Sequence, residues 1–454
     1  MKLPRRDLFK TSAGALAFSL PAWLKMRSEA NAALTPRPGS GKAKNCIIVY
    51  CWGGMSHHET FDPKPFAPLG IRGPFGTIPT TIPGYHVGEH IPKMAQQTDR
   101  LAIIRSMNHT DSAHGRGMYW NMTGHKPPRV GNIPPKPEDW PSLAAMISLF
   151  RDSPRGVPQS VRLPYPMVDN GTLQAGEYGG FLGIKYDPIV IKTPAGKAWG
   201  GVSRTLGSEV LDLGEKKDQP RVTRRTDLLS KLESPVTNIK DDFESFVHFR
   251  QLATDILVSS KVRDAYNLDN EPTPLREKYG NHIGGQSLLL ARRMIEAGVP
   301  VVQVICSAGD LNGGSGDMWD THSDNFNRLK NNLLPVWDQG SSALLDDLDD
   351  RGMLDETLVV FLTEFGRTPK INGNKGRDHY PSVYSVALAG GGIKGGNVYG
   401  SSDGNGAYPR NNPSSPADLH ATIFNSLGIH HNTEIHDPLG RPIPMCEGEP
   451  LPLL

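Results

Sequence analysis

Five short apolar runs, each bounded by Gly or Pro, are the feature that most constrains the fold of this 454-residue chain. The runs are apolar along almost their whole length, which is typical of strands buried on both faces of a sheet. We predict strands at residues 46–51, 101–107, 299–306, 357–363 and 382–389.

Helical patterns lie between these runs. Apolar residues recur at helical spacing within residues 288–295 and again within residues 326–337, where Pro335 predicts a kink. A further helix is expected at residues 343–348, ending near Gly352. Strands that alternate with helices predict an α/β sandwich with a largely parallel central sheet and helices on both faces. Functional groups in such a sheet gather at the carboxyl ends of the strands.

The first 32 residues have the features of a twin-arginine export signal. Arg5 and Arg6 precede a modestly apolar stretch at residues 13–24, and an A-x-A cleavage site follows at residues 30–32. The apolar stretch is about half as long as the ~20 residues of a membrane span, and Pro21 interrupts it. We therefore expect export by the twin-arginine machinery, cleavage, and a periplasmic or extracellular protein without a stable membrane span.

The remaining chain, residues 33–454, is predicted to form one domain with an excursion over the sheet at about residues 175–242. The balanced composition of the full chain, with a formal net charge of +2, gives no indication of binding to nucleic acid or an anionic membrane. The few cysteines lack a C-x-x-C zinc spacing and are expected to pack in the core. They are Cys46, Cys51, Cys306 and Cys446.

Four polar segments follow predicted strands, and the first lies at residues 52–62. Its two glycines allow a close backbone approach to a ligand, and its imidazoles and carboxylates are suitable metal ligands. The alternative is a surface turn with polar side chains. The candidate residues are His57, His58 and Asp62.

The second segment lies at residues 108–117. A serine beside histidine, aspartate and arginine at the end of a strand can be a nucleophile with an anion-binding arginine, although Ser-rich loops often look similar. The candidate residues are Asp111, Ser112 and His114.

The third segment, residues 319–324, follows a Gly-rich loop. Asp320 and His322 lie two apart in this segment and can meet one divalent cation. The alternative is N-capping of the following helix by Ser323 or Asp324. The two roles are compatible, because His322 is not needed for capping.

The fourth segment comprises residues 363–369 and 376–381. Glu364 is placed as a carboxylate ligand, His379 can complete a metal site, and Arg367 can neutralise an oxyanion. Asp378 is a further candidate beside them. Ion pairs between the arginines and nearby carboxylates are the alternative.

Several motifs resemble those of an exported family, the domain-of-unknown-function family numbered fifteen hundred and one, in the alkaline-phosphatase and sulfatase-like superfamily. The segments that carry the resemblance cover most of the mature chain. They are residues 60–65, 275–304, 363–369, 376–381, 389–396 and 418–422.

The resemblance implies a metallohydrolase arrangement, in which divalent cations flank a nucleophile that attacks phosphorus or sulfur. It implies Asp320, His322 and His379 as ligands of one metal site and Glu364 as a ligand of a second. Residues 111–113 are similar to the nucleophile segment of alkaline phosphatases, which makes Ser112 the expected nucleophile. Arg367 would clamp the oxyanion.

Two positions depart from the pattern of the superfamily. Phe365 replaces a His or Asn ligand, and Gly53 stands where the first strand should deliver an Asp. The second metal site is therefore expected to be incomplete, unless His57, His58, Glu59 or Asp62 substitutes. No C-x-P-S-R or C-x-A-x-R segment is present, which argues against a standard sulfatase.

These observations predict an exported, metal-dependent hydrolase that acts on a phosphate or sulfate ester of a small molecule or polysaccharide. The divalent cation could be Zn, Ca, Mg or Mn. Twin-arginine export fits this hypothesis, since it moves folded proteins that have already acquired a metal. The alternative is a non-catalytic exported protein that binds an anionic polysaccharide or an envelope component.

Overall fold

The computed structural model describes residues 40–169, 171–191, 260–306 and 318–454. The predicted export signal, most of the predicted excursion and the Gly-rich loop before Asp320 lie outside the described residues. Among the helices in the described part of the chain, none combines the length and apolarity needed to cross a bilayer.

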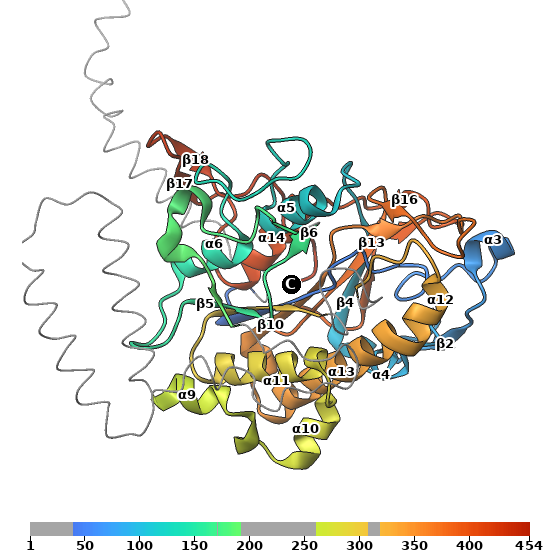
Figure 1. The fold of residues 1–454 in the computed structure, drawn as a ribbon, viewed down its shortest axis with the longest axis horizontal. Helices are drawn as coiled ribbons and strands as arrows, with labels where there is room; N and C mark the ends of the chain where they lie inside the picture. The colour runs from blue at the N-terminus through green and yellow to red at the C-terminus, as the bar shows by residue number, and fades with distance from the viewer. Residues whose placement is uncertain (1–39, 170, 192–259, 307–317) are drawn as a thin grey trace, which may run out of the picture.

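An eight-stranded sheet forms the centre of the described structure (Figure 1). Its strand order is β14-β4-β13-β10-β1-β9-β5-β8. In chain order the strands are β1 (Asn45–Tyr50), β4 (Leu101–Met107), β5 (Ser160–Leu163), β8 (Ile189–Val190), β9 (Val301–Ile305), β10 (Thr357–Leu362), β13 (Tyr384–Ala389) and β14 (Asn397–Tyr399). The five predicted strands are confirmed as β1, β4, β9, β10 and β13.

All neighbouring strands pair in parallel except at β13, which is antiparallel to both β10 and β4. A parallel pair needs a long crossover, which is usually a helix. The connection from β10 to β13 contains no helix and instead forms a small hairpin of β11 (Gly366–Arg367) and β12 (His379–Tyr380). The chain therefore returns in the opposite direction, and the predicted largely parallel sheet is confirmed.

Alternate side chains along the central strand β1 pack into two separate cores, as expected for a strand buried on both faces. Ile47, Val49 and Cys51 belong to one core, while Cys46 and Ile48 belong to the other. All four cysteines are buried and free, as predicted.

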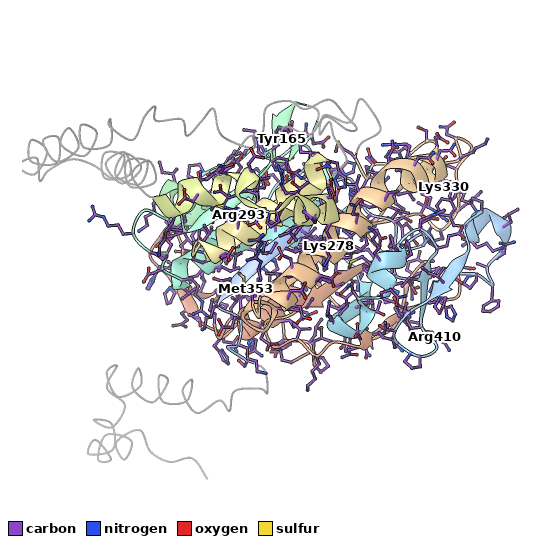
Figure 2. The ribbon with its side chains drawn as sticks, turned by 90° about the horizontal axis from the view of Figure 1, so that it is seen from below. Tyr165, Lys278, Arg293, Lys330, Met353 and Arg410 are labelled. Carbon is purple, nitrogen blue, oxygen red and sulfur yellow. The ribbon has the colours of Figure 1, made fainter. Side chains whose placement is uncertain are left out.

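Helices cover both faces of the sheet, which confirms the predicted sandwich (Figure 1). One face carries α4 (Pro92–Ala95), α9 (Ser260–Tyr266), α10 (Thr273–Tyr279), α11 (Ile283–Glu296) and α13 (Leu334–Asp350). Figure 2 views this side, with Lys278 of α10 and Arg293 of α11 on its helices. The opposite face carries α5 (His114–Thr123), α6 (Leu143–Phe150) and α14 (Pro416–Ser426).

The remaining short elements lie in the connections. They are α3 (Leu69–Arg72), α12 (Asn325–Arg328) and the two-stranded pairs β2 (Thr77–Pro79) with β3 (His86–Gly88), β6 (Val168–Asp169) with β7 (Thr172–Leu173), β15 (Ser401–Ser402) with β16 (Pro409–Asn411), and β17 (Glu434–His436) with β18 (Pro442–Pro444). Pro335 occupies the first turn of α13, after a π-helical segment at Leu329–Leu333. The predicted kink thus coincides with a change of helix type.

Candidate metal centre

Four parallel strands, β1, β4, β9 and β10, end at the same edge of the sheet, and the segments that follow them meet there. Gly53 shows how closely they approach. Its backbone has φ +116°, and a Cβ atom at this position would lie 2.4 Å from the Asp320 nitrogen. A side chain would therefore separate the segment after β1 from the segment that carries Asp320.

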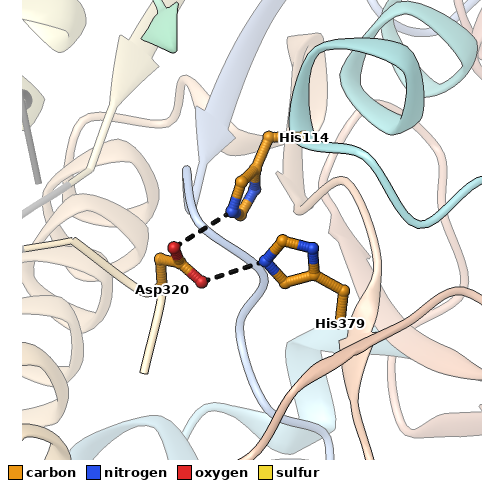
Figure 3. A group of neighbouring side chains, drawn as sticks. All are labelled: His114, Asp320 and His379. Atoms are coloured by element: carbon orange, nitrogen blue, oxygen red, sulfur yellow. Dashed lines mark hydrogen bonds and ion pairs between the residues drawn. The ribbon is translucent and has the colours of Figure 1, made fainter. Parts of the chain in front are cut away.

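The carboxylate of Asp320 lies at the centre of this edge (Figure 3). Its Oδ1 lies 3.1 Å from His379 Nε2 and 3.1 Å from His322 Nε2. Its Oδ2 lies 3.2 Å from His114 Nε2. Three imidazoles from distant parts of the sequence thus present the same ring nitrogen to one carboxylate.

The other ring nitrogen of each imidazole faces an oxygen. His114 Nδ1 lies 2.7 Å from Glu364 Oε1, and His379 Nδ1 lies 2.7 Å from the Ser112 carbonyl oxygen. His322 Nδ1 lies 2.7 Å from Asp378 Oδ1. Since a carbonyl or carboxylate oxygen accepts, each Nδ1 carries a hydrogen and donates it, which leaves Nε2 available as a metal ligand.

The Nε2 atoms of the three imidazoles lie close enough to one another and to Asp320 to share a cation. His114 Nε2 is buried without the alignment of a hydrogen bond to Asp320, and His322 Nε2 lies only 2.8 Å from His379 Nε2. Ligand atoms of His114, Asp320 and His379 all lie within 4.8 Å of one another. Two imidazoles and one carboxylate are a ligand set that suits a divalent cation such as Zn²⁺. The residues present therefore fit the predicted metal.

Two of the three imidazoles, those of His114 and His322, have a raised pKa, whereas burial lowers the pKa of His379. Burial acts to lower the pKa of His114, but the carboxylates of Asp320 and Glu364 together raise it to about 9. The hydrogen bond to Asp320 raises the pKa of His322. Burial acts to raise the pKa of Asp320, yet its three imidazole neighbours hold it well below its usual range. Positive charge is therefore favoured at the centre, and a cation would supply it in place of protons.

Glu364, predicted as a ligand, lies one layer behind the centre. Its side chain is fully buried, and its Oε1 accepts from Gly53 N at 2.7 Å as well as from His114 Nδ1. A carboxylate behind a ligating imidazole fixes the ring and raises its basicity. In the structure Glu364 contacts the centre through the imidazole of His114.

Arg367, predicted as an oxyanion clamp, is fully buried and holds the protein's own oxygens. Its Nη2 donates to Asp320 Oδ1 at 2.7 Å and its Nε donates to the Gly54 carbonyl at 2.9 Å. Its Nη1 donates to the Arg377 carbonyl at 3.1 Å. Each nitrogen is thus already bound to a protein acceptor, and the guanidinium orients Asp320.

Ser112 lies beside the centre on an exposed loop, directly before α5. Asp111 is engaged by Arg116, whose Nε donates to both carboxylate oxygens at 2.9 and 2.8 Å. Among the described residues, neither terminal amino group of Arg116 has a hydrogen-bond acceptor. An arginine with free donors therefore lies one helical turn from Ser112.

His57, His58 and Asp62 form a separate buried group. His57 Nε2 bonds to the Gly406 carbonyl at 2.9 Å, and Asp62 is paired with Lys64 at 2.8 Å. Within the part of the chain that the structure describes, only His114, Asp320 and His379 form a group of three or more metal-ligating side chains. The structure therefore does not bring this first polar segment to the metal centre.

Sequence reasoning assigned no role to His109, which is buried between Asp111 and Glu364. The sequence also indicated His114 as a candidate residue of the second polar segment, but not as a metal ligand. A signal existed for both, because each lies in the polar segment that follows a predicted strand. The spacing within that segment could not show which imidazole would face Asp320.

Comparison with known proteins gives a match to one family model. Residues 43–452 match the model described as "Protein of unknown function (DUF1501)". No curated protein matches the sequence.

Several solved structures are similar in fold at low sequence identity. A protein in the alkaline phosphatase superfamily from Vibrio parahaemolyticus shares 11% identity, with 87% of this chain and 68% of that chain covered and a TM-score of 0.37. The phosphonate monoester hydrolase from Silicibacter pomeroyi shares 10% identity, with 90% and 76% covered and a TM-score of 0.40. The C-terminal periplasmic domain of EcEptC from Escherichia coli, in complex with Zn, shares 10% identity, with 87% of both chains covered and a TM-score of 0.37. With TM-scores below 0.5, these likenesses indicate nothing about the chemistry of this chain.

Proposed function

Because the chain belongs to the DUF1501 family of proteins of unknown function, its own site has to indicate its chemistry, and we propose that it is a metal-dependent hydrolase of phosphate or sulfate esters. One observation carries the proposal. Three imidazoles donate through Nδ1 to fixed oxygens and turn Nε2 toward the single carboxylate of Asp320. Such a set of groups is costly to assemble without a cation to bind.

In this proposal His114, Asp320 and His379 hold the cation, and His322 is the fourth ligand. His322 is the most exposed of the three imidazoles, with 44% of its side chain accessible. This exposed ligand marks the side on which substrate could reach the centre from solvent. A divalent cation bound there would act as a Lewis acid toward an ester oxygen.

Ser112 is the proposed nucleophile, and Arg116 binds the anionic oxygens of the ester. The terminal amino groups of Arg116 can form paired hydrogen bonds with a phosphoryl or sulfuryl group, while Asp111 fixes the guanidinium through Nε. The N-terminus of α5, which has no side-chain cap, also favours an anion at this place. Arg116 thus takes the role that we had expected of Arg367.

We further propose that the mature protein acts outside the cytoplasm after twin-arginine export. The paired Arg5 and Arg6 and the following apolar stretch support this proposal. The substrate is an ester of a small molecule or polysaccharide, because the exposed Ser112 loop leaves room for a large leaving group.

The test is to load the mature protein with Zn²⁺, Mn²⁺, Mg²⁺ or Ca²⁺ and to assay aryl phosphate and aryl sulfate. His379→Ala should lower bound metal and abolish turnover, because the change removes a ligand. Ser112→Ala should keep the metal and lose turnover. His436→Ala is the matched control, since His436 is exposed on β17, and it should leave both properties unchanged.

Turnover that persists in His379→Ala would exclude this centre. Stoichiometric metal and phosphate binding without turnover of any ester would favour the alternative, a non-catalytic protein that binds anionic polysaccharide. Metal content by mass spectrometry and turnover by absorbance separate these outcomes.

A further inference from the structure

The loop that carries Ser112 and the backbone of Glu364 meet at one side chain, the imidazole of His109. This residue follows β4, and only 6% of its surface is exposed. The Asp111 amide donates to His109 Nδ1 at 3.1 Å, and His109 Nε2 lies 2.6 Å from the Glu364 carbonyl oxygen. Nδ1 therefore accepts while Nε2 donates, and one form satisfies both bonds, the neutral ring with its hydrogen on Nε2.

The surroundings of His109 favour that neutral form. Burial lowers the pKa of His109 to about 4. The rings of Trp120 and Tyr384 pack against the imidazole, with centroids 5.2 and 5.5 Å away. The ring therefore has little freedom to turn, and its two nitrogens face fixed partners.

The short bonds of His109 to the Asp111 amide and the Glu364 carbonyl differ in whether another residue duplicates them, and Asn121 Nδ2 also lies 3.4 Å from His109 Nε2. The Glu364 carbonyl also accepts from Asn121 Nδ2 at 2.9 Å, and Asn121 is fixed in turn by the Tyr384 hydroxyl at 2.7 Å. Within the described residues, the Asp111 amide has only His109 Nδ1 as an acceptor. If the donating Nε2 were lost, Asn121 would still bond to the Glu364 carbonyl. If the accepting Nδ1 were lost, the Asp111 amide would have no acceptor among the described residues.

We propose that His109 is a positioning residue, which sets the place of Ser112 relative to the metal centre by accepting the hydrogen of the Asp111 amide. The proposal rests on the proposed function to the extent that Ser112 is the nucleophile. Ser112 follows Asp111 directly, and its carbonyl oxygen accepts from His379 Nδ1. A fixed Asp111 amide therefore fixes the backbone on which the hydroxyl is carried.

Two isosteric substitutions separate the two sides of the imidazole. In His109→Asn, the amide oxygen can take the place of the accepting Nδ1. In His109→Gln, the longer side chain brings an amide nitrogen to the place of the donating Nε2. We expect His109→Gln to speed hydrogen exchange of the Asp111 amide roughly fivefold, the loss typical of one hydrogen bond, while His109→Asn keeps the wild-type rate.

The same asymmetry is expected in catalysis. His109→Gln should lower kcat about tenfold with little change in KM or in metal affinity, because a displaced nucleophile affects the chemical step. His109→Asn should retain most of kcat. His125→Gln is the control: His125 is also buried, with a lowered pKa due to burial, but it stacks on Trp140 outside this network. It should change neither exchange at Asp111 nor kcat.

Equal exchange at Asp111 in the Asn and Gln variants would overturn the inference. The inference would also be overturned if kcat fell only in proportion to a lowered Tm, because that result would show a merely structural role for His109. Exchange at Asp111 requires neither substrate nor cation. A wild-type protein without turnover would therefore refute the proposed function alone, and the exchange rates would still decide the role of His109.

Discussion

His114 joins two carboxylates that serve different purposes. Its Nδ1 donates to Glu364, which is fully buried, and its Nε2 faces Asp320, which is partly exposed. A buried carboxylate that bonds to an imidazole fixes the orientation of the ring, whereas an accessible one is available to a ligand. We therefore propose that Asp320 binds the metal and that Glu364 orients the His114 ligand.

This division predicts the effect of Glu364→Gln. The amide keeps an oxygen that can accept from one partner, but it removes the charge that makes His114 a strong ligand. We expect metal affinity to fall roughly 10- to 100-fold, as is usual for a residue behind a ligand. Titration with a competing chelator measures this change.

The control for that prediction is Asp320→Asn, which alters a proposed ligand directly. Its loss of affinity should exceed that of Glu364→Gln. The reverse order would show that Glu364 is the ligand, as the sequence had suggested.

At the residue scale, the sequence identified most of the side chains that lie around Asp320, but not which of them contact one another. Asp320, His322 and His379 were predicted as ligands, and the structure brings them together. The sequence pattern could not show that His114 would lie between Glu364 and Asp320, because these contacts join segments that are distant in the chain. Arg367 was predicted to neutralise an oxyanion or to pair with carboxylates, and in the structure it donates to four backbone carbonyls and one carboxylate. No signal in the sequence indicated the backbone acceptors, because most of them lie far from Arg367 in the chain.

Among the elements, the loop between β11 and β12 positions His322 through close packing of backbones. A Cβ atom on Gly376 would lie 1.9 Å from the His322 carbonyl oxygen, whereas Gly373 in the same loop has open space around it. The Arg377 amide also donates to the Thr321 carbonyl at 3.0 Å. The loop thus fits against the backbone on both sides of His322.

Gly376→Ala should therefore displace His322 and weaken the centre. We expect metal affinity to fall about tenfold or more, since a shift near 1 Å is enough to disrupt a positioned group. Gly373→Ala, the matched control, should bind metal like the wild type. Isothermal titration with Zn²⁺ compares the two variants, and equal affinities would show that the loop does not position His322.

The strands at the centre of the sheet were predictable because short, continuous apolar runs are typical of strands that are buried on both faces. The edge strands β8 and β14, and β5 next to β8, were not predicted, since they are short and carry weaker patterns. The direction of β13 could not be predicted either, because it depends on the hairpin inserted between β10 and β13. β8 lies within the predicted excursion, so the beginning of that segment extends the sheet.

Over the whole molecule, several buried histidines predict sensitivity to acid. Burial lowers the pKa of His57, His109 and His420 to about 4. Between pH 6.5 and 4 the unfolded chain binds protons at these positions and the folded protein does not. The free energy of unfolding should therefore fall as the pH falls through this range, on the order of 2 kcal/mol for each histidine.

Within the metal centre, His114 and His322 do not add to this effect because their pKa values are raised, whereas burial lowers the pKa of His379. The pKa of His114 is raised, so its contribution is fully present below pH 6.5 and is lost only as the pH rises toward 9. Chemical denaturation at a series of pH values, with a chelator present, measures the slope. His420→Gln should flatten it, and an unchanged slope would refute the assignment to buried neutral histidines.

The three residues proposed to hold the cation lie far apart in the chain, at positions 114, 320 and 379. The last of them lies on β12, and only two strands of the large sheet, β13 and β14, follow it in the chain. A ribosome has therefore made most of the polypeptide before the full ligand set exists. Nascent chains stalled before residue 379 should capture no metal, and loading becomes an event that follows synthesis.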